Sequence, residues 1–154
     1  MPSATEISYA AAAAMIDPVF NTLLEGGAGD AVIAIYAGTI PADCEAAITG
    51  TLLGVCKMTA TTPFIAAANQ NPNARIQANA ISDDTAADTT GTATHFRASI
   101  SADGVTPDAA GIIQGSAGLS GATPDLTLDD ENIVVNGTIS ITGWDLTMPE
   151  YSGA

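Results

Sequence analysis

The residue types most able to support chemistry in this chain are carboxylates, and they gather in three stretches. The stretches are Asp83, Asp84 and Asp88, then Asp103 and Asp108, and finally Asp129, Asp130 and Glu131. Clustered carboxylate oxygens bind calcium, yet no stretch follows the spacing of an EF-hand loop. We therefore interpret these carboxylates as turn caps and surface charge, and we predict no metal site. Paired carboxylates can also hydrolyse glycosides, but few aromatic residues are present to stack on sugars, which disfavours a hydrolase using Asp83, Asp84 or Asp129.

Nucleophilic and cofactor chemistry has little support in the sequence. His95 is the single histidine, so a zinc site built on paired histidines is excluded. No serine lies in a Gly-x-Ser-x-Gly motif, and no glycine-rich loop carries the lysine of a phosphate-binding loop. His95 falls on the polar face of an expected strand over 92–101, where we expect it to be exposed to solvent, with a pH-dependent or ligand-binding role as the alternative. The sequence predicts no catalytic residue and no cofactor.

Two cysteines, Cys44 and Cys56, are the remaining reactive side chains. Their spacing matches no metal-binding pattern, and the chain has no Cys-x-x-Cys motif. Two buried free thiols are the first expectation. A disulfide between Cys44 and Cys56 is the alternative, if the protein spends time in oxidising surroundings.

The charge balance excludes several classes of partner. The chain has a net charge of −14, from 17 acidic residues against Lys57, Arg75 and Arg97. Binding to nucleic acid or to an anionic membrane surface needs clustered Lys or Arg, so we expect neither partner. No apolar stretch is long enough for a transmembrane helix, and the N-terminus does not read as a signal peptide. The acidity indicates a solvated, self-repelling surface; adaptation of the host to salt would also fit.

Chain length and composition indicate one domain over 1–154 with a thin core. The 154 residues suit a single domain, and 47% are hydrophobic, but only 5% are aromatic and alanine dominates. Small side chains fill a core poorly, so we expect contacts with other chains to supply part of the stability.

The segment 8–25 has the pattern of an amphipathic helix. Ile16, Val19, Phe20 and Leu23 recur at spacings of three and four residues, which places them on one stripe. Pro18 lacks a backbone N–H, so the helix is either kinked there or restarts, and Asp17 as an N-cap favours a restart. Such a stripe usually packs against its own domain, and docking on a partner is the alternative.

The rest of the chain, about 31–149, alternates short β-patterned runs with turn-rich segments. We expect strands over 31–37, 51–58, 74–82, 92–101, 111–117, 125–128 and 138–148. The turns between them are built from Gly, Pro, Asn, Asp and Thr. This spacing predicts a mainly β fold, an antiparallel β-sandwich or jelly-roll-like barrel, with one N-terminal α-helix.

The last expected strand carries two local signals. Asn136-Gly137 is the favoured two-residue turn of a β-hairpin, because both residue types tolerate positive φ. Apolar residues then occupy odd positions up to Ile141 and even positions from Trp144 onward. A slip of one residue turns the apolar face outward unless a bulge absorbs it, so we predict a bulge at Gly143 in one long bent strand that Pro149 ends.

Taken together, the motifs resemble those of small virion structural proteins of tailed bacteriophages. The resemblance covers about residues 8–149 and is carried by IYAGTIP (35–41), TGTLL (49–53), ADTTGTATHFR (87–97) and DLTMP (145–149). The chain departs from that group at Ala37, where a threonine is expected, and in having the pair Cys44 and Cys56. The second departure suggests covalent or redox features particular to this chain.

The resemblance implies a non-enzymatic role in building the phage particle. It indicates a decoration or cement protein on the capsid exterior, made in the host cytoplasm, that binds the major capsid protein and its own copies as a homo-oligomer such as a dimer or trimer. The candidate assembly contacts are Ile16, Val19, Phe20 and Leu23. A tail or fibre component is the alternative, including a module that binds a host surface or glycan through Tyr36, Trp144 and Tyr151.

Overall fold

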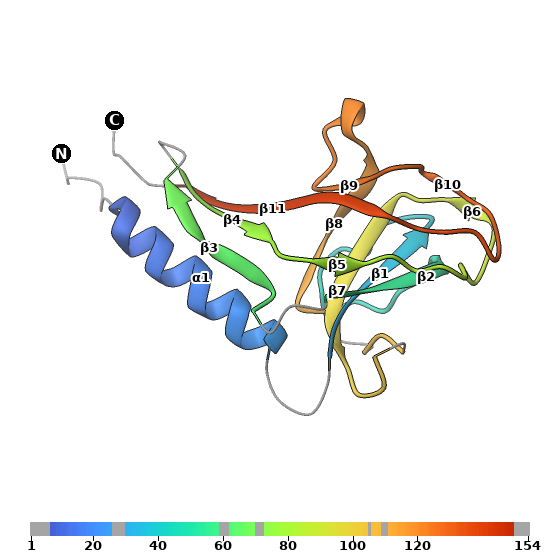
Figure 1. Cartoon of the computed structure of the whole chain (residues 1–154), viewed down its shortest axis with the longest axis horizontal. Coiled ribbons are helices and arrows are strands. Elements are labelled where there is room, and N and C mark those ends of the chain that lie inside the picture. Colours follow the sequence, from blue (N-terminus) through green and yellow to red (C-terminus); the bar gives the residue numbers. More distant parts are fainter. Residues whose placement is uncertain are drawn as a thin grey trace.

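The chain folds into one strongly curled β-sheet with a helix packed against it (Figure 1). This computed structural model describes residues 7–25, 30–58, 62–69, 73–104, 106–108 and 111–149. The mainly β fold with one N-terminal helix is therefore confirmed. Among the described residues, no helix is both long enough and apolar enough to span a membrane.

The elements follow one another as a single helix and then a series of strands. They are α1 (Tyr9–Glu25), β1 (Asp30–Ala37), β2 (Thr51–Met58), β3 (Phe64–Asn69), β4 (Asn73–Ala78), β5 (Ile81–Ser82), β6 (Gly91–Thr92), β7 (His95–Ser101), β8 (Ile113–Leu119), the 3-10 turn η1 (Ser120–Ala122), β9 (Leu126–Leu128), β10 (Asn132–Ile133) and β11 (Ile141–Pro149). The strand order in the main sheet is β3-β4-β11-β9-β8-β7-β1-β2-β5, and β10 pairs with β6 separately. Pairing is antiparallel except between β8 and β9, which are parallel.

The sheet is curled because one stretch of chain contributes to both of its ends. β4 lies near one end of the strand order and β5 forms the other end, yet only residues 79–80 separate them in sequence. The stretch 73–82 therefore pairs first with β11 and then with β2. This division was not predicted, since the sequence indicates one continuous strand over 74–82.

The other strand predictions agree with the structure to differing degrees. β1, β2 and β9 lie close to their expected bounds, and β8 begins two residues later than expected. The expected strand over 92–101 is divided into β6 and β7. β3 was missed because its sequence, FIAAAN, contains three alanines, a residue type with low strand propensity.

β11 contains the predicted bulge. Its register against β9 shifts between Ile141 and Gly143, so Ile139 before the bulge and Trp144 after it are both buried. The first part of β11 pairs with β9 and the rest with β4. The strand therefore bends from one partner to the next, as the change of apolar phase indicates.

The predicted hairpin at Asn136-Gly137 is wrong. β10 pairs with β6, not with β11. The turn instead spans Val134 to Gly137, closed by a hydrogen bond of 2.7 Å from the Gly137 N–H to the Val134 carbonyl. Asn136 does adopt a positive φ of 62°, but as the third residue of this turn. Asparagine is tolerated there because its short polar side chain permits the left-handed conformation.

The predicted restart at Pro18 is also wrong, since α1 is one continuous helix. A proline inside a helix costs about 3 kcal/mol, because it removes a backbone hydrogen bond and crowds the preceding turn. Burial of Ala12 and Ile16 before the proline and of Leu24 after it favours keeping both halves on one axis. Asp17 does not cap a helix; its carboxylate accepts a hydrogen bond of 2.5 Å from the Asn21 amide.

Aromatic side chains join the helix to the sheet in the core. Phe20 of α1 lies edge-on to Phe64 of β3, with 6.4 Å between the ring centroids. Trp144 of β11 lies edge-on to both Phe64 and Phe96, at 5.1 Å in each case. Edge-to-face pairs of this kind stabilise beyond the area they bury. Trp144 is therefore the central side chain of the core.

Side chains of α1 also cover β3, which is an end strand of the sheet. The Phe64 N–H donates to Asn21 Oδ1 at 2.8 Å, and Asn21 Nδ2 donates to the Phe64 carbonyl at 3.4 Å. The Tyr9 hydroxyl donates to the Ala67 carbonyl at 3.0 Å. Unpaired backbone groups on a sheet edge promote pairing with other chains. α1 thus supplies partners for backbone groups of β3.

Replacement of Asn21 by alanine should destabilise the protein by about 1–3 kcal/mol, because the buried Phe64 N–H would lose its acceptor. Urea denaturation followed by Trp144 fluorescence measures the change in the free energy of unfolding. The neighbouring variant Thr22→Ala, at an exposed position of the same helix, should change it by no more than about 0.5 kcal/mol. Equal stability of the two variants would contradict this role of Asn21.

Candidate functional site

A group of polar and titratable side chains lies on the outer face of β1, β7 and β8. Phe96 and Ala98 of β7 face the core, whereas His95, Arg97 and Ser99 alternate with them on the opposite face. We call the outward-facing set the polar layer; it consists of Tyr36, His95, Arg97, Ser99 and Gln114. The polar layer is largely buried, because residues 38–50, here named the covering loop, fold over it and are hydrogen-bonded to it.

His95 is therefore buried, with only 1% of its surface exposed, and the prediction of an exposed His95 is wrong. Its ring stacks on Tyr36, with 5.3 Å between ring centroids and 16° between planes. Its Nδ1 lies 3.1 Å from the Thr94 hydroxyl, which donates to the Gly38 carbonyl at 2.7 Å. Gly50 packs so close that an added Cβ would lie 3.1 Å from His95 Cε1.

Arg97 ties the covering loop to the sheet. Its Nη2 donates to the Asp43 carbonyl at 3.1 Å and to Gln114 Oε1 at 2.8 Å. Gln114 Nε2 in turn donates to the Pro41 carbonyl at 2.9 Å. Gly111 passes so close to the Arg97 side chain that a Cβ there would overlap it. These contacts give Arg97 a structural role, which the sequence did not indicate.

The two cysteines are both free, so the alternative of a disulfide between them is not realised. Cys56 is buried in the core and its thiol lies 3.6 Å from the Ile139 carbonyl. Burial raises the pKa of Cys56 to about 12, so this thiol is protonated at neutral pH. Cys44 is partly buried in the covering loop, where its carbonyl accepts the Gly111 N–H at 3.2 Å.

Several carboxylates cap backbone groups. Asp84 Oδ2 accepts the Val55 N–H at 2.9 Å, in the space that a side chain at Gly54 would occupy. Asp103 accepts hydrogen bonds from the backbone and hydroxyl of Thr106, both at 2.7 Å. Within the described residues, no three His, Cys, Asp or Glu side chains lie close enough to hold a metal ion.

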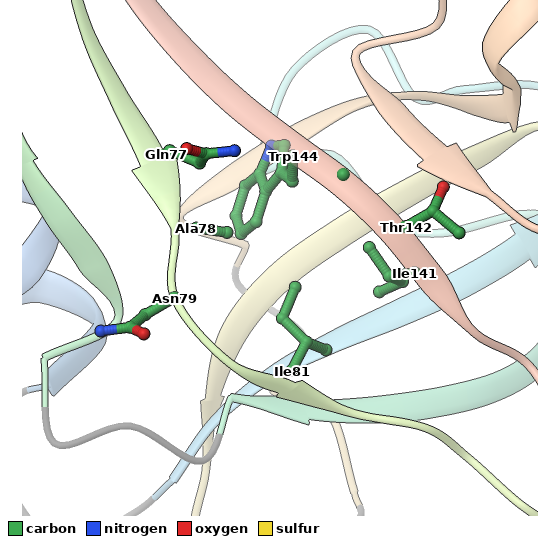
Figure 2. A pocket seen from close by; sticks show the side chains of 8 residues that line it. Gln77, Ala78, Asn79, Ile81, Ile141, Thr142 and Trp144 are labelled. Atoms are coloured by element: carbon green, nitrogen blue, oxygen red, sulfur yellow. The ribbon is translucent and has the colours of Figure 1, made fainter. Parts of the chain in front are cut away.

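A small cavity lies where the chain leaves β4 for β5 (Figure 2). Its volume is about 100 Å³, and it is lined by Gln77, Ala78, Asn79, Ile81, Ile141, Thr142, Gly143 and Trp144. Ile81 and Ile141 face each other across it, whereas Asn79 points away and donates to the Thr62 carbonyl at 3.3 Å. Pockets for small-molecule ligands usually exceed about 300 Å³. We therefore regard the cavity as a gap in packing where the two strands separate.

The four predicted assembly contacts do not form one exposed stripe. Ile16 is 1% exposed and belongs to the core, and Phe20 is partly buried against Phe64. Leu23 is 47% exposed, whereas the side chain of Val19 lies outside what the structure describes. Ile16 is therefore unavailable to a partner, because the helix uses it to pack on its own sheet.

The most exposed large apolar residue in the described part of the chain is Val134. Val134 is 61% and Val135 46% exposed, in the turn from Val134 to Gly137 that we name the valine turn. The exposure of these two valines was not predicted, because a run of two valines is typical of a strand. The signal available was their position directly before Asn136-Gly137, since a turn exposes neighbouring side chains that a strand would place on opposite faces.

The valine turn is held rigidly in place. The Val135 N–H donates to the Thr90 hydroxyl at 2.9 Å, and the Asn136 N–H donates to the Ala87 carbonyl at 2.8 Å. The Ala87 N–H returns a hydrogen bond of 2.9 Å to the Gly137 carbonyl. The apolar side chains are thus presented on a preorganised backbone, which lowers the entropy lost on binding.

One thiol per native chain should react readily with a thiol reagent such as DTNB near pH 8. Cys44 is partly exposed, whereas Cys56 is buried and its raised pKa leaves almost no thiolate. Unfolding in guanidinium should release the second thiol, and a Cys44→Ser variant should show none before unfolding. Two readily reacting thiols in the native chain, or none in either state, would contradict these placements.

Comparison of the chain with protein-family models, with curated proteins and with solved structures gives no match in any of the three. Function must therefore be argued from the residues and from the arrangement described above.

Proposed function

We propose that this chain is a non-enzymatic structural protein of a tailed bacteriophage particle. In this proposal it decorates the capsid exterior, bound to the major capsid protein and to its own copies. The motifs IYAGTIP, TGTLL, ADTTGTATHFR and DLTMP support the proposal by their resemblance to small virion proteins.

The single observation that carries the proposal is the valine turn. Two neighbouring valines are exposed on a turn whose backbone is hydrogen-bonded to the segment beside it. Neighbouring exposed apolar side chains are a candidate surface for binding another protein. Burying one such side chain in a complex contributes about 1.5–3 kcal/mol.

The surroundings of the valine turn favour a partner with basic residues around an apolar pocket. Asp129, Asp130 and Glu131 precede the turn closely in the chain, and Asp88 follows the residue that binds it. Complementary charge accelerates association and excludes wrong partners. In a chain of net charge −14, such acidic ends disfavour contact with each other.

Contacts between copies are more favourable at the end of the molecule that carries α1. α1 and the valine turn lie at opposite ends of the long axis (Figure 1). Met15 and Leu23 are exposed on α1, with Pro18 and Thr22 exposed between them and Ala11 and Ala14 exposed just before Met15. We propose that this end contacts neighbouring copies and that the valine turn contacts the shell.

The structure gives less support to a glycan-binding role than the sequence did. Tyr36 and Trp144, two of the three aromatic residues considered for it, are buried, and Tyr151 lies outside the described residues. A tail component would also make contacts through α1 and the valine turn. Binding to purified heads or to purified tails therefore distinguishes a head location from a tail location.

The double variant Val134→Ser/Val135→Ser should bind phage heads lacking this chain at least about tenfold more weakly than the natural chain. Co-sedimentation with purified heads, and separately with purified tails, measures the binding. Because both valines are exposed, the stability of the variant should change by no more than about 0.5 kcal/mol. Leu119→Ser, which removes an exposed apolar side chain elsewhere, is the matched control and should bind normally.

Binding of the natural chain to tails alone would replace the head location by the tail alternative. Binding to neither would contradict the proposed function. Full binding by the double variant to heads would leave the role in the particle standing but remove the valine turn from it.

A further inference from the structure

His95 of β7 is buried beside Tyr36 of β1 and close to the covering loop. Its ring is stacked on Tyr36 on one side, and Gly50 closes in on its Cε1 atom. The covering loop holds this place through the hydrogen bond from the Thr94 hydroxyl to the Gly38 carbonyl. The ring of His95 is 1% exposed, so a positive charge on it would lose most of its hydration unless the protein around it rearranges.

The hydrogen bonds of His95 suit a neutral ring. Nδ1 lies beside the Thr94 hydroxyl at 3.1 Å, whereas Nε2 is buried and has no hydrogen-bond partner among the described residues. A neutral imidazole needs only one N–H donor, so Nε2 can remain an unprotonated acceptor. A protonated ring would place a charged N–H in a buried position with nothing to accept it, which is strongly unfavourable.

The nearest fixed charge on β7 also opposes protonation. Arg97 lies on the same face of the strand, two residues from His95, and is itself buried. Tyr36 of β1 is uncharged, because burial raises the pKa of its hydroxyl above the usual value. Burial lowers the pKa of His95, and the Arg97 guanidinium lowers it further, against a smaller opposite effect of hydrogen bonding to Gly38.

Among the described residues on the other elements around His95, the carboxylates are hydrogen-bonded elsewhere or exposed. On the covering loop, Asp43 accepts the backbone N–H groups of Glu45 and Ala46, and Glu45 is exposed. Cys44, on the same loop, is a thiol. On β8, Ser116 lies opposite His95 and is bound to Asp125, whose carboxylate accepts the Ser116 N–H and hydroxyl at 2.8 Å.

We infer that His95 is an acid-sensitive latch: protonation of its imidazole releases the covering loop from the outer face of β1 and β7. The loop is the element that gives way because it forms no helix or strand and most of its side chains are exposed. Hydrogen bonds to the carbonyls of Gly38, Pro41, Asp43 and Cys44 attach it to the rest of the chain. Segments with few buried contacts open more easily than the core.

The direction of the pH dependence follows from proton binding. The closed form has a lowered His95 pKa, so it binds fewer protons than an open form with the usual value near 6.5. The stability of the closed form is therefore complete above about pH 6.5 and falls as the pH drops below it. One proton changes the opening equilibrium by up to about tenfold per pH unit.

Hydrogen exchange measured by mass spectrometry at about pH 7.5 and about pH 5, corrected for the intrinsic effect of pH on exchange, tests the latch. Peptides over 38–50 should lose protection by at least about threefold in acid, while those over β9 and β11 should not change. In His95→Gln, which cannot be protonated, the acid-induced loss over 38–50 should disappear. Unchanged protection in the natural chain, or an equal loss in His95→Gln, would overturn the inference.

A second measurement keeps the test valid if His95→Gln does not fold. His95 is the single histidine, so its Cε1 proton gives one unambiguous NMR signal in the natural chain. The signal should titrate below the usual histidine range and should shift together with amide signals of the covering loop. Titration at or above about 6.5 with unmoved loop signals would equally overturn the latch. Neither experiment depends on the proposed place in a phage particle.

Discussion

The burial of Trp144 between Phe64 and Phe96 is the interaction on which the rest of the fold depends. It requires a bulge in β11, because apolar side chains before and after the bulge must both point inward. Gly143 permits this bulge: a Cβ there would lie 2.8 Å from the Thr127 hydroxyl, which donates to the Gly143 carbonyl at 3.0 Å. The curvature of the sheet and the docking of α1 both follow from this arrangement, since Phe64 connects Trp144 to Phe20.

The bend in β11 also explains the shape of the sheet. Once β11 passes from β9 to β4, the chain after β4 must turn away to reach β2, and the small cavity in Figure 2 marks that separation. β3 is then left as an end strand, and α1 lies along it with Asn21 bound to Phe64. In a fold with small side chains and few aromatic residues, the packing of large side chains is thus concentrated around Trp144.

Sequence patterns predicted what depends on neighbouring residues. The strand over 51–58, the helix over 8–25 and the phase change at Gly143 each reflect a local geometry, and each has its counterpart in the structure. Prediction failed where segments that are distant in sequence determine whether a side chain is buried. Alternation correctly placed His95 opposite Phe96, but it could not reveal that residues 38–50 cover that face. Asn21 was missed for the same reason, because its partner Phe64 lies far away in sequence.

The arrangement of polar groups fits a protein that acts through its surface. His95, Arg97 and Cys56 are buried in contacts within the chain, while exposed apolar side chains remain on the valine turn and on α1. The most direct test of the proposed place in a phage particle is a cryo-electron microscopy reconstruction of such a particle. The account predicts repeated copies of this fold on the exterior of the capsid, with the valine turn against the shell and α1 toward neighbouring copies. A particle that carries this chain nowhere on its head or tail would contradict it.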